Sequence, residues 1–301
     1  MLKWNWLILY LLLCAPLTGC AILIPGECVK GSCKEGPGTY QFHNGNSYVG
    51  QWENRKLNGQ GVFNFASGPF EGGHYEGEFL NNKINGHGTF YYANGDKYEG
   101  DFKANKIDGQ GTFHYVNGDR YEGEFKANKI DGQGKFYYAN GDYYVGDFKA
   151  NKATGQGTFH FTTGKYAGGR YEGGWKNNEM TGKGTFYYKD GNRYEGDWQH
   201  NLKHGKGVFY FNSGEFKGGK YEGDFRKNNI SGKGTFTYAN GDRYEGDFRN
   251  NAVTGRGVMY FKDGNKYDGE WQNNIFHGRG TLTYSYGREL SGEWRNGEFQ
   301  E

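Results

Sequence analysis

Hydrophobic and polar residues alternate in short stretches along most of the chain, and each stretch ends at a turn. Phe90 and Tyr92 flank Tyr91, and in the matching stretches the first position is apolar and the third is Tyr or Phe. The middle position varies, with His114 and Thr237 among its occupants. Alternation with a period of two predicts β-strands that bury one face and expose the variable face to water.

Asn-Gly and Asp-Gly pairs between these stretches predict β-hairpins. In the hairpin that turns at Gly95, a two-residue loop would mix the two faces. A three-residue loop with Gly95 in the left-handed conformation places Phe90 opposite Tyr98. The same register places Gly88 opposite Gly100. We therefore expect a bulged turn, with the aromatic rings and the glycines on one face of the sheet.

The stretches belong to one unit that recurs from Tyr48 onward. The segment Tyr98-Glu99-Gly100-Asp101-Phe102 returns at position 121, which is 23 residues later, as Tyr121-Glu122-Gly123-Glu124-Phe125. Unit starts are Tyr48, Tyr75, Tyr98, Tyr121, Tyr144, Tyr171, Tyr194, Tyr221, Tyr244 and Tyr267, with a final half-unit from Leu290. Repetition at such a period is typical of an architecture in which each unit packs on its neighbours.

Three units contain a four-residue insertion. The insertions are Phe70-Glu71-Gly72-Gly73, Tyr166-Ala167-Gly168-Gly169 and Phe216-Lys217-Gly218-Gly219. We expect them to form protruding hairpin tips that mark a docking edge. Phe70, Tyr166 and Phe216 are therefore candidate interaction residues.

The pattern Tyr-x-Gly-x-Trp/Phe, followed by Gly-x-Gly and Asn-Gly, resembles the MORN (membrane occupation and recognition nexus) repeat. The resemblance covers residues 36–298, as ten units of 23 or 27 residues with a half-unit at each end. With the hairpin pattern, it implies an all-β fold, an elongated, rod-like single-layer antiparallel sheet of repeated hairpins. The half-units would cap the edges of this sheet.

The second turn of each unit carries a recurrent apolar residue that should cover the edge of the aromatic rings, and Lys203 interrupts this series once. The opposite face carries charges such as Glu99 and Asp101, which we interpret as a solvated charge ladder. A recurrent lysine gives one modest basic row, which is a further candidate interaction surface: Lys83, Lys106, Lys129 and Lys152.

Residues 1–19 have the proportions of a secretory signal, with one lysine before an apolar run. The following Leu17-Thr18-Gly19-Cys20 resembles the lipobox of bacterial lipoproteins, which implies cleavage before Cys20 and acylation of its thiol and amino group, with palmitate or a similar chain. Ala21, in place of Asp, then favours the outer membrane if the organism has one. An uncleaved anchor and an ordinary signal cut elsewhere are the alternatives.

Cys28 and Cys33 remain in the expected tether, residues 20–35. The oxidising cell envelope favours a small-loop disulfide between them. A zinc site is the alternative, but two further ligands are lacking nearby.

Composition and motifs argue against catalysis. The chain has 55 Gly, 26 Tyr and 23 Phe but only 4 Pro, and its formal net charge is +2, which gives no overall attraction to nucleic acid. Each Gly-x-Gly opens a strand instead of a helix, so a dinucleotide site is excluded. The pair Glu99 and Asp101 recurs in most units, which is typical of a charge ladder and not of a glycosidase. We expect no enzyme activity, cofactor or metal.

These observations favour a lipid-anchored scaffold at the bacterial cell envelope that binds a protein partner or a second copy of itself. Rows of rings beside carboxylates leave a carbohydrate-binding or peptidoglycan-binding module as an alternative. Phospholipid binding, which the resemblance suggests, is weakened by the balanced charge.

Overall fold

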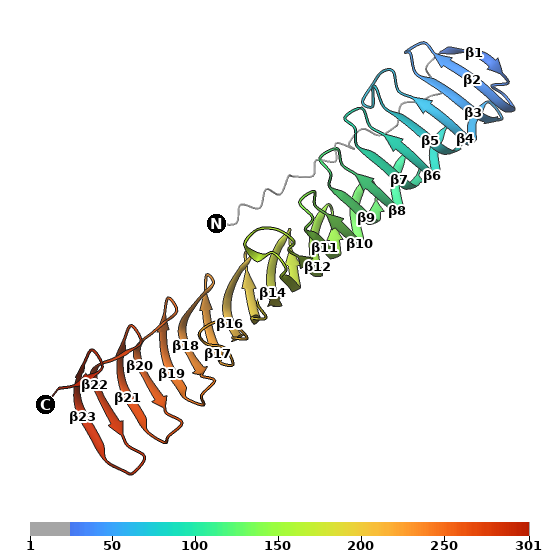
Figure 1. Cartoon of the computed structure of the whole chain (residues 1–301). Coiled ribbons are helices and arrows are strands. Elements are labelled where there is room, and N and C mark those ends of the chain that lie inside the picture. Colours follow the sequence, from blue (N-terminus) through green and yellow to red (C-terminus); the bar gives the residue numbers. More distant parts are fainter. Residues whose placement is uncertain (1–24, 301) are drawn as a thin grey trace. The chain divides into compact units, whose positions relative to one another are not determined.

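The computed structural model describes residues 25–300, in two compact units that end at Ala153 and begin at Thr154. Both units consist of antiparallel β-strands that follow one another in chain order (Figure 1). The described residues contain one short 3₁₀ helix, Gly164–Tyr166. None of the helical structure in residues 25–300 is long and apolar enough to span a membrane.

The first unit contains strands β1 to β11. Their bounds are β1 Gly26–Gly31, β2 Gly36–Phe42, β3 Ser47–Glu53, β4 Lys56–Asn64, β5 His74–Leu80, β6 Lys83–Tyr91, β7 Lys97–Lys103, β8 Lys106–His114, β9 Arg120–Lys126, β10 Lys129–Tyr137 and β11 Tyr143–Lys149.

The second unit contains β12, whose residues lie mostly after the boundary, and the strands that follow it. Their bounds are β12 Lys152–His160, β13 Arg170–Lys176, β14 Glu179–Tyr187, β15 Arg193–Gln199, β16 Leu202–Tyr210, β17 Lys220–Arg226, β18 Asn229–Thr237, β19 Arg243–Arg249, β20 Ala252–Tyr260, β21 Lys266–Gln272, β22 Ile275–Thr283, β23 Glu289–Arg295 and β24 Glu298–Phe299. The predicted all-β fold of repeated hairpins is confirmed.

The turn at Gly95 has the predicted bulged form. The N–H of Tyr92 donates to the carbonyl of Asp96 at 3.0 Å, and the N–H of Gly95 donates to the carbonyl of Tyr92. Gly95 has φ of 92°, a left-handed conformation that glycine adopts at little cost. Phe90 consequently pairs with Tyr98, as the sequence predicts.

The second turn of each unit has two residues. Ala104 and Asn105 have φ of 49° and 68°, which suits the type I′ turn that connects twisted strands. Between the pairs Phe102–Ile107 and Gly100–Gly111, strand β8 has two residues more than β7. This bulge makes every second strand longer than its partner.

The core consists of aromatic rings laid across glycines. The side chain of Tyr98 is completely buried, and its hydroxyl donates to the carbonyl of Asp101 at 3.1 Å. Its ring makes edge contacts with Phe102 of the same strand and with Phe125 of the next hairpin, both at 5.1 Å. Burial of the hydroxyl raises the pKa of Tyr98 well above its usual value. The interpretation of the rings as the core of a thin sheet is therefore confirmed.

The same burial recurs at every unit start. The ten tyrosines in this position are at most 1% exposed: Tyr48, Tyr75, Tyr98, Tyr121, Tyr144, Tyr171, Tyr194, Tyr221, Tyr244 and Tyr267.

Side-chain amides join each second turn to the one before it. The Oδ1 of Asn105 accepts a hydrogen bond from the N–H of Ile84 at 2.8 Å, and the N–H of Asn105 donates to the carbonyl of Ile84. The first turns are joined in a similar way, since Asp96 Oδ1 accepts the N–H of Val116 at 2.8 Å. These bonds satisfy backbone groups that would otherwise be unpaired at the sheet margin.

The insertions do not protrude as the sequence analysis expects, because their rings fold back onto the core. Phe70 lies 5.6 Å from Phe65 and 5.2 Å from Phe90, measured between ring centroids. The N–H of Gly72 donates to the carbonyl of Phe65, which closes the loop. An aromatic residue buries more apolar surface in this position than at an exposed tip, and this gain accounts for the difference.

Candidate interaction surfaces

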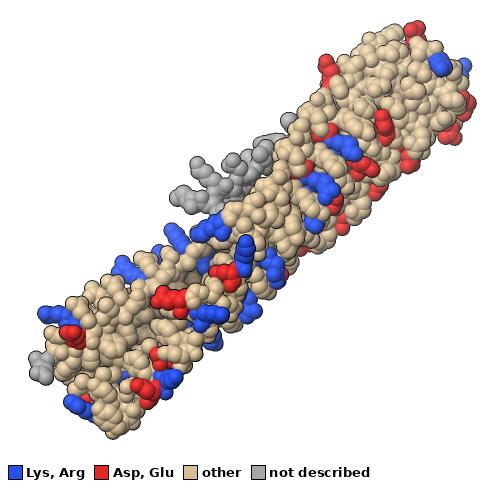
Figure 2. All heavy atoms as spheres, viewed as in Figure 1, with Lys and Arg blue, Asp and Glu red and all other residues tan. Residues whose placement is uncertain are grey.

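The two faces of each sheet differ in chemistry. We call the face that holds Tyr98 and Gly100 the ring face, and the face that holds Glu99 and Asp101 the charged face. Lysine, arginine and acidic residues are interspersed on the visible surface of each unit (Figure 2). Most charges on the charged face are paired, as in Lys97–Glu99 at 3.1 Å. This face is a polar surface of alternating sign.

A groove of about 740 Å³ runs over the charged face of the second unit. The backbone of Gly207 and Gly234 lines it between the charged side chains. Val208 and Thr235 also line it. Lysines and glutamates border it in two rows: Lys183, Lys206 and Lys233, and Glu195, Glu222 and Glu245. Each of these glutamates forms a salt bridge with a neighbouring cation, Arg193, Lys220 or Arg243.

Salt bridges hold the basic row in place. Lys183 lies 2.7 Å from Asp197, and Lys206 lies 2.7 Å from Asp224. Although burial opposes its ionisation, hydrogen bonds from Lys183 and from the N–H of Lys206 lower the pKa of Asp197. Both aspartates are thus ionised at neutral pH, while the lysine side chains stay about 70% exposed or more.

The same aspartates have a structural role that the sequence analysis missed. Asp197 Oδ2 accepts the N–H of Lys206, and Asp224 Oδ2 accepts the N–H of Lys233, both at 3.0 Å. Each N–H belongs to a bulge of the longer strand, where the regular ladder leaves it unpaired. The recurrence of an acidic residue directly after the glycine of most units is the signal that could have revealed this bond.

The predicted basic row lies at the start of the longer strands. Lys83, Lys106 and Lys129 begin β6, β8 and β10 and are exposed. Lys106 pairs with Lys103, and Lys129 pairs with Lys126, so like charges lie directly opposite each other in the first unit. Lys152 begins β12 and is also exposed.

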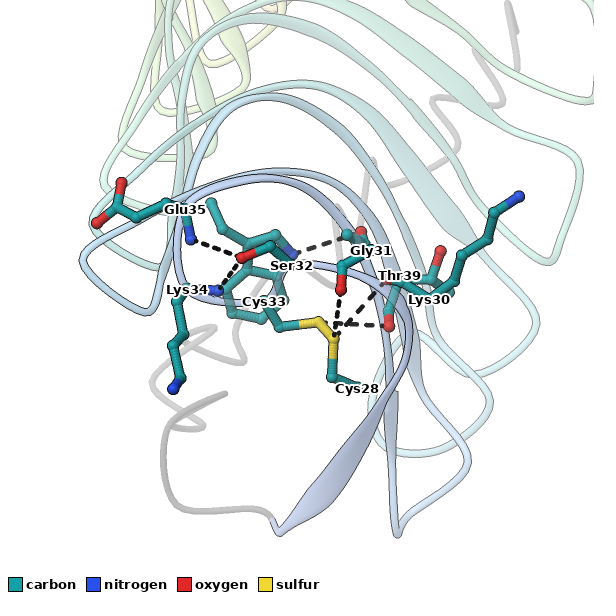
Figure 3. Close-up of a disulfide and its surroundings, with 10 residues drawn as sticks. Cys28, Lys30, Gly31, Ser32, Cys33, Lys34, Glu35 and Thr39 are labelled. Atoms are coloured by element: carbon teal, nitrogen blue, oxygen red, sulfur yellow. Dashed lines mark hydrogen bonds between the residues drawn. A yellow bond between two sulfur atoms is a disulfide. The ribbon is translucent and has the colours of Figure 1, made fainter.

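The disulfide lies at the first strand of the sheet. Cys28 and Cys33 are bonded, with an S–S distance of 2.06 Å and a Cα–Cα distance of 5.9 Å (Figure 3). Residues 26–31, within the expected tether, form β1 and pair with β2. The disulfide therefore closes the turn between these strands. Cys20 lies outside the described residues, so the structure does not bear on its acylation.

The other inserted rings also lie on the ring face. Tyr166 contacts Phe186 at 5.2 Å, and Phe216 contacts Phe236 at 5.3 Å. Phe216 stays 41% exposed, so it still presents apolar surface. Among residues 25–300, no group of three or more His, Cys, Asp or Glu side chains could hold a metal ion.

A family model for the MORN repeat matches eleven segments of the chain. They are residues 34–47, 48–69, 75–97, 98–120, 121–143, 144–166, 171–193, 194–216, 221–243, 244–266 and 267–285. The chain belongs to the MORN repeat family. The MORN segments leave gaps after residues 69, 166 and 216, where the insertions lengthen the unit. MORN repeats make this chain a repeat-based interaction or binding module.

This chain is only distantly similar to the solved structures with which it was compared. The TCP10 domain of Danio rerio CPAP, solved with a peptide of Danio rerio STIL, is 10% identical, with a TM-score of 0.24 over 90% of this chain and 99% of that chain. Virginiamycin B lyase from Staphylococcus aureus is 11% identical, with a TM-score of 0.15 over 89% and 87%. No curated protein matches the sequence significantly. At these TM-scores, the function has to be argued from the residues of this chain.

Proposed function

We propose that this chain is a non-enzymatic scaffold of the bacterial cell envelope, anchored by lipid on Cys20, and that it binds a protein partner along the charged groove of the second unit. The motif Leu17-Thr18-Gly19-Cys20 supports the anchor. Each buried CH₂ group contributes about 0.8 kcal/mol, and stable attachment takes more than one acyl chain. In a Gram-negative organism, Ala21 favours the outer membrane.

The groove is the observation that carries the binding part of this proposal. It offers lysines on one side, glutamates on the other and backbone between them. Such a surface complements an extended protein segment that carries both charges, since opposite potentials across an interface give specificity. A uniformly anionic surface would meet the glutamate row as well and would be repelled by it.

Crosslinking tests the partner. A photo-crosslinking amino acid at Val208, in the groove, should capture a protein in living cells. Thr112 is the matched control, because it precedes Phe113 on the charged face of the first unit as Val208 precedes Phe209. The variant Lys206→Glu with Lys233→Glu should abolish the adduct. The proposal fails if adducts form equally at both positions or persist in the charge-reversed variant.

Two alternatives are decided by sedimentation of the full chain. The opposed lysine pairs of the first unit favour phospholipid binding as a second candidate, since juxtaposed cations attract anionic headgroups. Binding to phosphatidylglycerol vesicles that is lost in Lys106→Glu with Lys129→Glu would support it. Sedimentation with purified peptidoglycan would instead support the glycan alternative.

Fractionation tests the anchor. Cys20→Ser removes the thiol that the lipobox pattern acylates, so the protein should leave the membrane fraction. Cys14→Ser is the matched control, because Cys14 lies within the expected signal. Membrane attachment of the Cys20→Ser variant would contradict the lipid anchor without affecting the groove.

A further inference from the structure

One residue on the ring face departs from the pattern of its position. The second residue after each second turn faces the rings, and it is apolar in every unit except one. The occupants are Leu57, Ile84, Ile107, Ile130, Ala153, Met180, Lys203, Ile230, Val253 and Phe276. Lys203 occupies it in β16, where it pairs with Trp198 of β15. A lysine in a buried apolar position costs stability, so its presence calls for a function.

The ammonium of Lys203 is surrounded by rings and has no acidic partner. Nζ lies 4.8 Å from the ring centroid of Phe209 and 5.4 Å from that of Tyr194. It donates a hydrogen bond to Tyr188 Oη at 3.3 Å. No carboxylate of residues 25–300 forms a salt bridge with it. Burial, and to a smaller extent Lys165, lowers the pKa of Lys203 to about 8.

A pocket of about 290 Å³ opens beside this ammonium. Phe209, Phe211, Phe225 and Phe236 line it with phenyl rings. Phe216 of the third insertion forms another part of its wall, and packs 5.6 Å from Phe211. The insertion therefore contributes to a pocket that a plain repeat would lack.

A second polar group lines the same pocket. Asn228 Oδ1 accepts the N–H of Lys203 at 2.9 Å, which fixes the orientation of the amide. The Nδ2 of Asn228 donates to no described group, so it is available to a ligand. Asn251 and Asn274 also line the pocket, with their Oδ1 atoms accepting the N–H groups of Ile230 and Val253, so the pocket combines an ammonium and side-chain amides with apolar walls.

We propose that this pocket binds a small apolar monocarboxylate, with the carboxylate on Lys203 Nζ and Asn228 Nδ2 and the apolar body among the phenyl rings. A single unpaired ammonium is neutralised by one negative charge. Apolar walls with a few fixed polar groups are typical of small-molecule sites. The volume is at the low end for such sites, which fits a ligand of the size of an aryl-alkanoate.

This site is independent of the proposed function. The pocket lies on the ring face, whereas the partner groove lies on the charged face of the same strands. Loss of binding in the pocket would leave the crosslink at Val208 unchanged, and the reverse also holds.

Three probes with the same apolar body test the proposal. 4-Phenylbutyrate, 4-phenylbutan-1-ol and 4-phenylbutylamine would be titrated, by ligand-observed NMR, into the full chain in phosphatidylcholine nanodiscs. We expect the carboxylate to bind with a Kd below about 1 mM, at least tenfold more tightly than the alcohol, and the amine not to bind. Equal affinity for the three, or no binding of the carboxylate, would overturn the proposal.

Variants locate the site. Lys203→Ile restores the usual residue of the position and should weaken carboxylate binding at least tenfold while the fold is retained. Lys206→Met is the matched control, because it removes a lysine from the opposite face of the same strand, and it should bind as the wild type does. Phe216→Ala should also weaken binding, since it removes part of the wall. Wild-type affinity in Lys203→Ile would refute the site.

Discussion

The hydroxyl of Tyr98 lies over the Cα of Gly111, where a Cβ on that glycine would come within 2.3 Å of the oxygen. The next nearest atoms of the same ring would lie at 2.6 Å. Real side chains do not approach so closely, so the ring can occupy this place only because the facing strand has no side chain there. Glycine, usually unfavourable inside a strand, is here a condition for burying the ring.

Gly111→Ala should therefore destabilise the sheet. The added methyl group would push Tyr98 out of its place, and overpacking of this kind costs about 1–3 kcal/mol. Thr112→Ala, on the charged face, should change stability by less than about 0.5 kcal/mol. Urea unfolding followed by tryptophan fluorescence measures both variants. A Gly111→Ala variant as stable as Thr112→Ala would contradict the packing described for Tyr98.

The amide of Asn105 should stabilise the contact between neighbouring units. Asn105→Gly keeps the left-handed conformation of the turn but removes the acceptor for the N–H of Ile84, which should cost about 1 kcal/mol. Ala104→Gly, in the same turn, relieves a positive φ and should not destabilise the protein. Hydrogen exchange at the Ile84 amide reports the loss directly. Unchanged protection of this amide in Asn105→Gly would show that the bond is unimportant.

Lys203→Ile should stabilise the protein near neutral pH. The native pKa of about 8 lies below the usual 10.5, so below pH 8 both states hold the proton and the full cost of burying the charge remains. That cost is on the order of 3 kcal/mol. Between pH 8 and 10.5 only the unfolded chain holds the proton, and the stability of the wild type should rise with pH.

The groups that face Lys203 do not reverse the expected rise of wild-type stability with pH. Burial raises the pKa of Tyr188 and of Tyr194, so both stay neutral in this range, and Lys165 is the other cation that lowers the pKa of Lys203. Unfolding of wild type and Lys203→Ile at pH 7 and pH 10 gives the difference. A difference that does not shrink at the higher pH would contradict a buried ammonium.

The tyrosine core should make the protein sensitive to alkali. Burial raises the pKa of Tyr267 to about 12 and raises those of Tyr98 and Tyr121 further still. Because the unfolded chain ionises near pH 10, the stability that these groups contribute is complete below pH 10 and is lost as pH rises further. Phenolate absorbance near 295 nm should therefore appear together with loss of β circular dichroism. Ionisation of these tyrosines at pH 10 with the sheet intact would contradict this.

The hairpins and their register could be predicted because their determinants are local. Gly95 in the left-handed position fixes the loop length, and the loop length fixes the pairing of Phe90 with Tyr98. The ring face follows from the same register. The pairing of Gly88 with Gly100 could be predicted, although the contact of Gly111 with the Tyr98 hydroxyl could not.

The insertion rings pack on the core instead of projecting from hairpin tips, for a physical reason, while the docking edge stays a prediction. A short loop with two glycines looks like an exposed tip when only neighbours in sequence are considered. The ring of Phe70 contacts Phe90 of the next hairpin, and this contact depends on how the hairpins stack. The bulge bonds of Asp197 were missed for the same reason, since the donor lies on another strand.

The sequence by itself determined the repeat, the turns, the register and the two faces, because each depends on conformational preferences within one unit. Only the tertiary structure decided what surrounds the residues that depart from the repeat, such as Lys203. The position of Lys203 was visible in the repeat, but the rings of Tyr194 and Phe225 beside its ammonium come from neighbouring strands that meet only in the folded sheet. The environment of a charge depends on what surrounds it in space, and the order of residues along one strand does not contain that information.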